Sequence, residues 1–380
     1  MEFCMRIANK AILNTIREEK NNNILISPAS FNIVLNMAAS GSGGKTLEQF
    51  LRFLGSKSVA QLNSNTKSLM ALTDQPPLSL VNAVFIDKSF TLKSSFTKLV
   101  RNVYKTEARS VNFNEVEALI EKLNSWAKYN TKGMISEFLP PTVKILQPPL
   151  LLANAIHFKA AWEKPFKASE TRNEDFHLLD RKTSVSVPFM VETSRREYYG
   201  SFEDFKVIRL FCRGNTLRKQ FCMDIILPHK RDGLQDVIEK FNSNPKLLQE
   251  DFELDTKRVD ELWIPKWKFS NDLVATELMK ELGLTLPFSF PDADITEMIE
   301  SPLSDLLYIK EIFQRSVIEV NEEGAAAAAV TCAMLYYGCA RSPPERITFI
   351  ADHPFMFMIK EIVSGAVIFT GAVLNPLSTT

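Results

Sequence analysis

The segment from Glu322 to Ala340 limits most strongly what this chain can fold into. Five consecutive alanines, Ala325–Ala329, follow Glu322-Glu323-Gly324, and residues 325–340 contain no Asp, Glu, Lys or Arg, although 24% of the chain is charged. Because alanine has the highest intrinsic helix propensity, one interpretation is a short buried helix. The segment is too short for a transmembrane helix, which needs about 20 predominantly apolar residues.

The second interpretation is a strand, because alternate residues of the segment are all small or apolar. Positions 325, 327, 329, 331, 333 and 335 are Ala, Ala, Ala, Thr, Ala and Leu, and the positions between them are also uncharged. One face of a strand needs this composition to enter the interior of a sheet. As a permanently exposed strand the segment would favour aggregation. The pattern therefore predicts an exposed loop that becomes a strand at a later step.

Motifs around this segment resemble those of the serpin family. Val320–Ala329 is similar to the hinge of the serpin reactive loop, and Phe349–Ile359 is similar to the C-terminal signature of the family. The FIADHPF phrase in this signature and the Leu-Pro-Pro at 139–141 look most like the plant, intracellular branch. Further matches cover nearly the whole chain in the expected order: Ile26–Ser30, Asn124–Trp126, Thr131–Ile135, Ala153–Lys159 with Trp162, Ile264–Phe269, Leu282–Leu284 and Val373–Pro376.

The resemblance implies a single domain over residues 1–380, with an α+β fold of three β-sheets and about nine helices. An exposed reactive loop would span residues 322–345 approximately. The implied activity is inhibition of a protease as a suicide substrate, in which the cleaved loop inserts into the main sheet. The trapped protease would be deformed before its acyl-enzyme is hydrolysed. The implied hinge residues are Glu322, Glu323, Gly324, Ala325, Ala326, Ala327, Ala328 and Ala329.

The spacing of the family places the scissile bond at Gly338–Cys339. The plant branch commonly has Leu-Arg before this bond, whereas this chain has Tyr337-Gly338. Trypsin-like specificity is therefore not expected, because glycine has no side chain to fill the primary pocket of a protease. Tyr337 suits papain-like cysteine proteases, or else cleavage follows Tyr337 and favours a chymotrypsin-like target. The residues expected to be recognised by the protease are Leu335, Tyr336 and Tyr337.

The resemblance also implies a hydrogen-bonded cluster that controls the opening of the main sheet. Ser27, Ser30 and Asn154 correspond to three members of this cluster. The family usually completes it with a histidine in the context Phe-His-Lys, where this chain has Phe313-Gln314-Arg315. A glutamine amide can also donate and accept hydrogen bonds, but the change alters the geometry on which sheet opening depends.

Three further residues correspond to the top of the main sheet, where insertion begins. They are Trp162, Lys266 and Glu322, and we expect an ion pair between the last two. Ala326 occupies a hinge position at which glutamate is typical, and it should face outward after insertion. The small-residue hinge favours an inhibitor. Gln314, Gly338 and the bulky residues before Gly338 favour the alternative, a non-inhibitory serpin with a binding, storage or chaperone-like role.

Three local patterns suggest enzymes, and each lacks an essential feature. Ala39–Thr46 resembles a phosphate-binding loop, but it lacks the leading glycine and follows a helical stretch, Phe31–Ala38, rather than a strand. The four histidines are far apart in the sequence and contain no His-x-x-x-His pair, so no metal site is expected. Cys339 has no charged neighbour to lower its pKa. We therefore expect neither an enzyme nor a metal or other cofactor.

Composition indicates the compartment and the class of partner. The formal net charge is zero, so nucleic acid and anionic membranes are not expected partners. The N-terminus lacks the apolar run of a signal peptide, and no Asn-x-Ser/Thr glycosylation acceptor occurs. Five scattered cysteines indicate free thiols in a reducing compartment. We expect a monomer in the cytoplasm, with the nucleus as a second location, whose partner is a serine or papain-like cysteine protease.

Hydrophobic periodicity predicts several elements directly. Helices are expected over Phe3–Glu19 and Glu115–Tyr129, and Ser27 should cap a helix that begins at Pro28. Helices and strands do not alternate regularly along the chain, which favours an α+β fold over a doubly wound sheet. Strands are expected over Ile24–Ile26, Leu150–Phe158, Phe205–Phe211, Phe221–Leu227, Leu262–Phe269 and Ala366–Leu374.

Overall fold

The computed structural model describes most of the chain. The described residues are 2–18, 21–72, 78–106, 108–133, 135–139, 150–180, 182–213, 220–244, 247, 251–300, 307–324 and 346–379. The predicted loop residues Ala325–Ala329, Leu335–Tyr337 and the Gly338–Cys339 bond lie outside these ranges.

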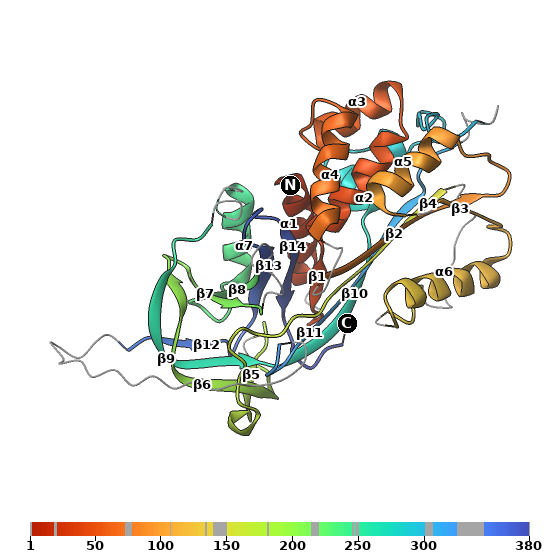
Figure 1. Ribbon diagram of the computed structural model, residues 1–380. Helices are drawn as coiled ribbons and strands as arrows, with labels where there is room; N and C mark the ends of the chain where they lie inside the picture. The colour runs from red at the N-terminus through yellow and green to blue at the C-terminus, as the bar shows by residue number, and fades with distance from the viewer. Residues whose placement is uncertain are drawn as a thin grey trace.

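Helices cover both faces of a five-stranded sheet, most of them on one face (Figure 1). The helix α6 (Val116–Asn130) packs on the opposite face from α2 (Pro28–Ser40). The remaining helices are α1 (Glu2–Arg17), α3 (Gly44–Phe53), α4 (Val59–Leu72), α5 (Ser94–Tyr104), α7 (Leu234–Ser243) and α9 (Thr276–Glu281), with short 3-10 turns at Ala168–Glu170 and Leu286–Phe288.

The described strands form two hydrogen-bonded sheets. The five-stranded sheet has the order β10 (Trp267–Val274), β11 (Glu311–Val320), β4 (Leu150–Phe158), β2 (Leu78–Asp87), β3 (Ala108–Val111). The nine-stranded sheet has the order β1 (Ile24–Ile26), β14 (Val367–Val373), β13 (Phe355–Glu361), β8 (Phe221–Pro228), β7 (Phe205–Phe211), β6 (Ser184–Ser201), β9 (Asp255–Pro265), β12 (Thr348–Ile350), and β5 (Arg172–His177) also pairs with β6.

The predicted α+β class is confirmed, and the long strand β6 explains why two sheets appear. β6 pairs with β5 and β9 along most of its length, and its last residues pair with β7. Hydrogen bonds therefore continue from the group β5, β6, β9 and β12 into the group that contains β7, β8, β13 and β14. The second and third expected sheets are joined through β6 into one network.

Strand β4 is buried along its whole length, as its continuous apolar sequence predicts. Successive side chains point to opposite faces, so Leu150 and Leu152 join the main core with α2. Leu151 and Ala153 join a second core with Trp126 of α6. A strand covered on both faces needs no polar side, which is why its sequence does not alternate.

The predicted single strand Leu262–Phe269 is wrong, because the chain changes sheets within it. β9 ends at Pro265 in the nine-stranded sheet, and β10 begins at Trp267 in the five-stranded sheet. Both strands are largely buried near the junction, so the apolar sequence continues across the corner without a break. Lys266, whose backbone N–H donates to the Pro188 carbonyl at 2.8 Å, lies at this corner.

The start of α2 is formed as predicted. The Ser27 hydroxyl accepts a hydrogen bond from the Ser30 N–H at 3.2 Å, and Pro28 occupies the first helical position. The glycine-rich stretch after α2 is a turn into α3 and not a loop between a strand and a helix. A Cβ at Gly43 would lie 2.8 Å from Asp294 Oδ2, so a carboxylate occupies the space beside this turn where a phosphate would have to bind.

No helix in the described ranges combines the length and the apolar character needed to cross a membrane.

Candidate functional site

The site is built around the seam between β4, the central strand of the five-stranded sheet, and its neighbour β11. They pair in parallel over Glu311–Val317 and Leu151–His157, and β11 runs on directly into the predicted hinge. In this register Gln314 lies opposite Asn154. A strand that entered the sheet here would have to separate this parallel pair, which is slightly less stable per residue than an antiparallel pair.

The structure brings Ser27, Ser30, Asn154 and Gln314 together beneath the seam. All four residues are buried. Gln314 makes two hydrogen bonds to one residue: its Oε1 accepts from the Ser27 N–H at 2.9 Å, and its Nε2 donates to the Ser27 carbonyl at 3.2 Å. The Ser30 hydroxyl donates to Asn154 Oδ1. Strand β11 is therefore bonded to the start of α2, and so is strand β4.

Sequence reasoning missed two members of this cluster. Asn154 Nδ2 donates to Asn82 Oδ1 at 2.7 Å, which extends the network to β2. The Ser316 hydroxyl donates to Gln314 Oε1 at 3.4 Å from the same strand. Asn82 is a polar residue in the middle of the apolar run Leu80–Ile86 of β2, and that is the only sequence signal that could have identified it. The cluster thus links three adjacent strands and one helix.

Gln314 should stabilise the closed sheet, which a Gln314→Met variant tests. Methionine has a similar size but leaves the buried Ser27 N–H without its partner, at about 1–3 kcal/mol. The Ser27 carbonyl loses one of two hydrogen bonds, because it still accepts from the Phe31 N–H at 3.1 Å. We expect the free energy of unfolding of the intact protein to fall by about 1–3 kcal/mol, measured by denaturant titration. Gln220→Met, at an exposed glutamine just before β8, is the control and should change it by less than about 0.5 kcal/mol. A loss in Gln314→Met no larger than in this control would contradict the assignment.

At the top of the sheet, Glu322 is held by groups from two other segments. Lys266 Nζ lies 2.9 Å from Glu322 Oε2, so the predicted ion pair is present. The Thr171 hydroxyl donates to Glu322 Oε1 at 2.7 Å. Burial alone would raise the pKa of the Glu322 carboxyl, but the hydrogen bonds from Lys266 and Thr171 outweigh burial and hold this pKa below its usual value. The corner at Lys266 therefore ties the hinge to the junction between the two sheets.

The backbone of the hinge is bonded to the segment Trp162–Phe166, which follows β4. The Trp162 N–H donates to the Glu323 carbonyl at 3.0 Å, and the Phe166 N–H donates to the Glu322 carbonyl at 2.8 Å. The indole of Trp162 donates to the Asn321 carbonyl at 2.9 Å. The described part of the hinge is thus fixed by three hydrogen bonds from one short segment.

The hinge requires a glycine at position 324, for reasons of backbone conformation and of space. Its φ of +87° lies in the left-handed region, and a Cβ at this position would come within 2.5 Å of the Ala160 carbonyl oxygen. Any other residue would displace the hinge from the end of β4.

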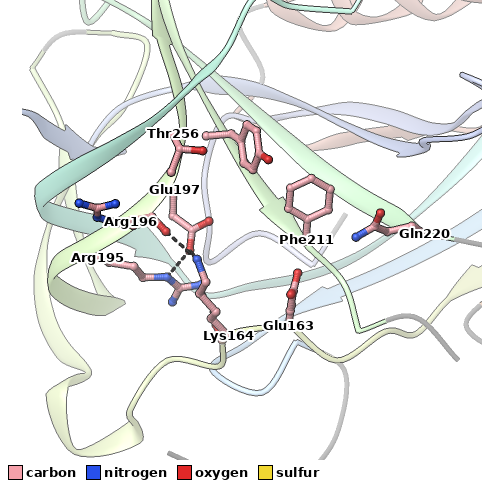
Figure 2. A pocket seen from close by; sticks show the side chains of 9 residues that line it. Glu163, Lys164, Arg195, Arg196, Glu197, Phe211, Gln220 and Thr256 are labelled. Carbon is pink, nitrogen blue, oxygen red and sulfur yellow. Dashed lines mark hydrogen bonds and ion pairs between the residues drawn. The ribbon is translucent and has the colours of Figure 1, made fainter. Parts of the chain in front are cut away.

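A cavity of about 480 Å³ lies beside the same segment, between β6, β7 and β9 (Figure 2). Glu163 and Lys164 form one side of the cavity, and Tyr198 and Phe211 form an aromatic wall with ring centroids 5.4 Å apart. Figure 2 shows Glu197 at the centre, with dashed contacts to Lys164 and Arg195. Arg195 in the lining of this cavity binds the Lys164 carbonyl. Lys164 belongs to the segment Trp162–Phe166, which is hydrogen-bonded to the hinge.

The described cysteines are unreactive by position. Cys4, Cys212 and Cys222 are free and buried. Burial raises the pKa of Cys4 to about 11 and the pKa of Cys212 to about 12, so both remain thiols at neutral pH. Over the described ranges, no three His, Cys, Asp or Glu side chains are grouped as a metal site would require.

Comparison with known proteins places this geometry in a family. The family model described as "Serpin (serine protease inhibitor)" matches residues 1–376. Among curated relatives, Serpin-ZXA of Oryza sativa subsp. japonica is 39% identical over 364 residues, covering 93% of this chain and 90% of the relative. Serpin-ZX of Arabidopsis thaliana is 37% identical over 377 residues, covering 97% and 95%.

Solved structures agree on the fold. The Arabidopsis serpin AtSerpin1, described in its native stressed conformation, superposes with a TM-score of 0.89 at 35% identity and covers 99% of this chain and 98% of its own. Serpin48 of the insect Tenebrio molitor superposes with a TM-score of 0.82 at 26% identity, covering 98% of each chain. The predicted fold and the resemblance to plant relatives are both confirmed.

Proposed function

The chain belongs to the serpin family, and from this premise we propose that it inhibits a protease as a suicide substrate. Membership of the family and the plant serpin relatives support the general function of a protease inhibitor rather than an enzyme. The finer proposal is that a serine or papain-like cysteine protease cleaves the reactive loop at Gly338–Cys339 or after Tyr337. The cleaved hinge then enters the seam between β4 and β11 as a new strand.

One observation carries the proposal: the strand that leads into the hinge pairs directly with β4. Strand β11 and strand β4 are a parallel pair inside the sheet, and the described hinge residues lie beside the end of this pair, against the segment that follows β4. A chain that leaves β11 after Val320 and turns at Gly324 can therefore fold back between these two strands once it is cut. The uncharged alanines that follow can be buried there without leaving an unpaired charge.

The decisive experiment mixes the protein with a panel of trypsin-like, chymotrypsin-like and papain-like proteases. An inhibitor of this class leaves a covalent complex that survives boiling in detergent and migrates at the summed mass. Such a band with any protease supports the proposal and identifies the target class. Complete cleavage of the loop by every protease without a complex would refute inhibition.

The residue before the scissile bond should decide the target class. We expect Gly338→Arg to create inhibition of trypsin-like proteases, because an arginine fills their primary pocket while the hinge and sheet are untouched. The second-order rate constant with trypsin should rise by at least about 100-fold over the wild type, as one charged pocket contact allows. Gly338→Ala is the matched control and should not respond to trypsin.

If Gly338→Arg is cleaved by trypsin and no complex forms, the failure lies in insertion rather than in recognition. That outcome favours the second candidate, a non-inhibitory serpin that serves as a binding, storage or chaperone-like protein. The specific observation behind this candidate is Gln314, which replaces the usual histidine and bonds to both backbone groups of Ser27. A sheet held more firmly closed would insert too slowly to trap a protease.

We further propose a single-domain, cytosolic monomer that needs no cofactor, with the nucleus as a second location. The buried free thiols of Cys4, Cys212 and Cys222 support a reducing compartment. The zero formal net charge argues against nucleic acid and anionic membranes as partners. Fractionation of the native host cells would test the cytosolic location. Sedimentation of the purified protein would test whether it is a monomer.

A further inference from the structure

Arg195 on β6 binds the middle of the segment Trp162–Phe166, and this segment is hydrogen-bonded to the hinge. Its Nη2 donates to the Lys164 carbonyl at 2.6 Å, and its Nε donates to Glu197 Oε1 at 2.6 Å. Its guanidinium carbon lies 4.5 Å from the centroid of the Phe166 ring. One planar side chain thus contacts both the third and the fifth residue of Trp162–Phe166.

Glu197 fixes the other end of Lys164. The Lys164 ammonium lies 3.3 Å from Glu197 Oε1 and donates to the Arg196 carbonyl at 2.6 Å. Lys164 is therefore bonded to β6 through its carbonyl and through its ammonium (Figure 2). The segment cannot move away from β6 without breaking charged hydrogen bonds, which are about twice as strong as neutral ones.

The two ends of the same segment bind the hinge. The Trp162 N–H and the Phe166 N–H donate to the carbonyls of Glu323 and Glu322, whereas Arg195 binds the residue midway between them. Insertion requires the hinge to leave these two N–H donors. How firmly the donors are held in place therefore sets how readily the hinge is released.

The arrangement suits positioning better than stability. Arg195 and Glu197 have side chains only 7% and 4% exposed, and a buried ion pair contributes little net stability after its desolvation. Arg195 Nη1 is buried and has no partner among the described residues, which adds to that penalty. Since burial of the Arg195–Glu197 pair adds little stability, we explain the pair by the position in which it holds Lys164.

We propose that Arg195 is a positioning residue for the reactive loop, which holds Trp162–Phe166 against β6 and so delays release of the hinge. Its effect on inhibition rests on the proposed function, whereas its effect on the segment does not. Removal of Arg195 should loosen the hinge before any protease is bound.

The test is amide hydrogen exchange of the intact protein, in which Arg195 is replaced by methionine. Methionine keeps an apolar contact with Phe166 and removes both hydrogen bonds. Within residues 162–166 the hydrogen-bonded amides are those of Trp162, Glu163 and Phe166, and Pro165 has none. We expect these three amides to exchange about tenfold faster, which corresponds to about 1.4 kcal/mol of lost local protection. Arg195→Lys, which keeps the charge without the planar fork, should fall between methionine and the wild type.

Arg172→Met is the matched control. Arg172 also pairs with a glutamate two residues later and also lies over an aromatic ring, with its guanidinium carbon 4.3 Å from the centroid of Trp263. None of its contacts in the described ranges is to Trp162–Phe166. This control should leave exchange of residues 162–166 unchanged. Equal acceleration in both variants, or none in Arg195→Met, would overturn the proposal.

A general loss of stability would be visible elsewhere in the molecule. If amides of α6 in Arg195→Met accelerate by the same factor as residues 162–166, Arg195 has only a structural role and the proposal fails. If residues 162–166 alone respond, spontaneous insertion of the intact loop should also be about tenfold faster, measured as loss of inhibitory capacity over time at constant temperature.

The two proposals fail in different ways. If exchange responds as expected but cleavage of the wild-type loop does not raise its stability, the suicide-substrate function is wrong and the role of Arg195 in holding the segment stands. If cleavage raises stability but exchange does not respond, the function stands and the role of Arg195 is wrong.

Discussion

Cleavage of the loop near Gly338 should raise the melting temperature of the protein by about 10 °C or more. The inserted hinge would form hydrogen bonds with both β4 and β11, each worth about 1 kcal/mol net, and these bonds outweigh the single ladder that is lost. The intact form persists because the barrier to opening the sheet is high, so its stability is kinetic. Thermal melts before and after limited proteolysis measure the change.

An unchanged or lower melting temperature after cleavage would place this chain among serpins that do not insert. A useful control is cleavage in Gln314→Met, whose intact form should melt lower than the wild type. Because insertion pulls β4 away from β11, the cleaved forms of the two proteins should differ less than the intact forms.

Ala327→Arg should convert an inhibitor into a substrate. Alternation predicts that residue 327 faces the interior of the sheet after insertion, so the variant buries an unpaired charge. The penalty is on the order of several kcal/mol after relaxation, and each 1.4 kcal/mol is about tenfold in rate where it is felt in the transition state. Insertion should then lose to deacylation, with cleaved inhibitor and active protease as the products.

Ala328→Arg is the built-in control, because its side chain should face outward. We expect the ratio of complex to cleaved product to fall by at least about tenfold for residue 327 and to change by less than about twofold for residue 328. The measurement is quantitative gel analysis of both variants with the same protease. Equal behaviour of the two variants would contradict strand insertion of this loop.

Local patterns in the sequence predicted the elements that carry the site. The cap at Ser27, the fully buried strand over Leu150–Phe158 and the short strand over Ile24–Ile26 follow from propensity, capping and apolar runs, and all three are present. The resemblance to a family supplied the residues beneath the seam, and the structure places Gln314 and Asn154 opposite each other. Their role in sheet opening stays a prediction.

Patterns in sequence could not locate the corner at Lys266 or the positioning residue Arg195. The apolar run through Lys266 is continuous because both sheets bury it, so periodicity contains no mark of the change of sheet. Arg195 lies in a polar strand sequence typical of an exposed surface. Its contact with Lys164 joins residues 31 positions apart in the chain, and no local rule connects them.

The sequence alone determined that a small, uncharged hinge follows β11, since burial of such a segment depends only on the size and charge of its side chains. It also determined the α+β class, because the order of helical and strand periods is a local property. The tertiary structure decided which strands flank the hinge and which groups hold it. These contacts depend on the register of β4 against β11 and on the packing of Trp162–Phe166 against β6, and both are set by the whole fold.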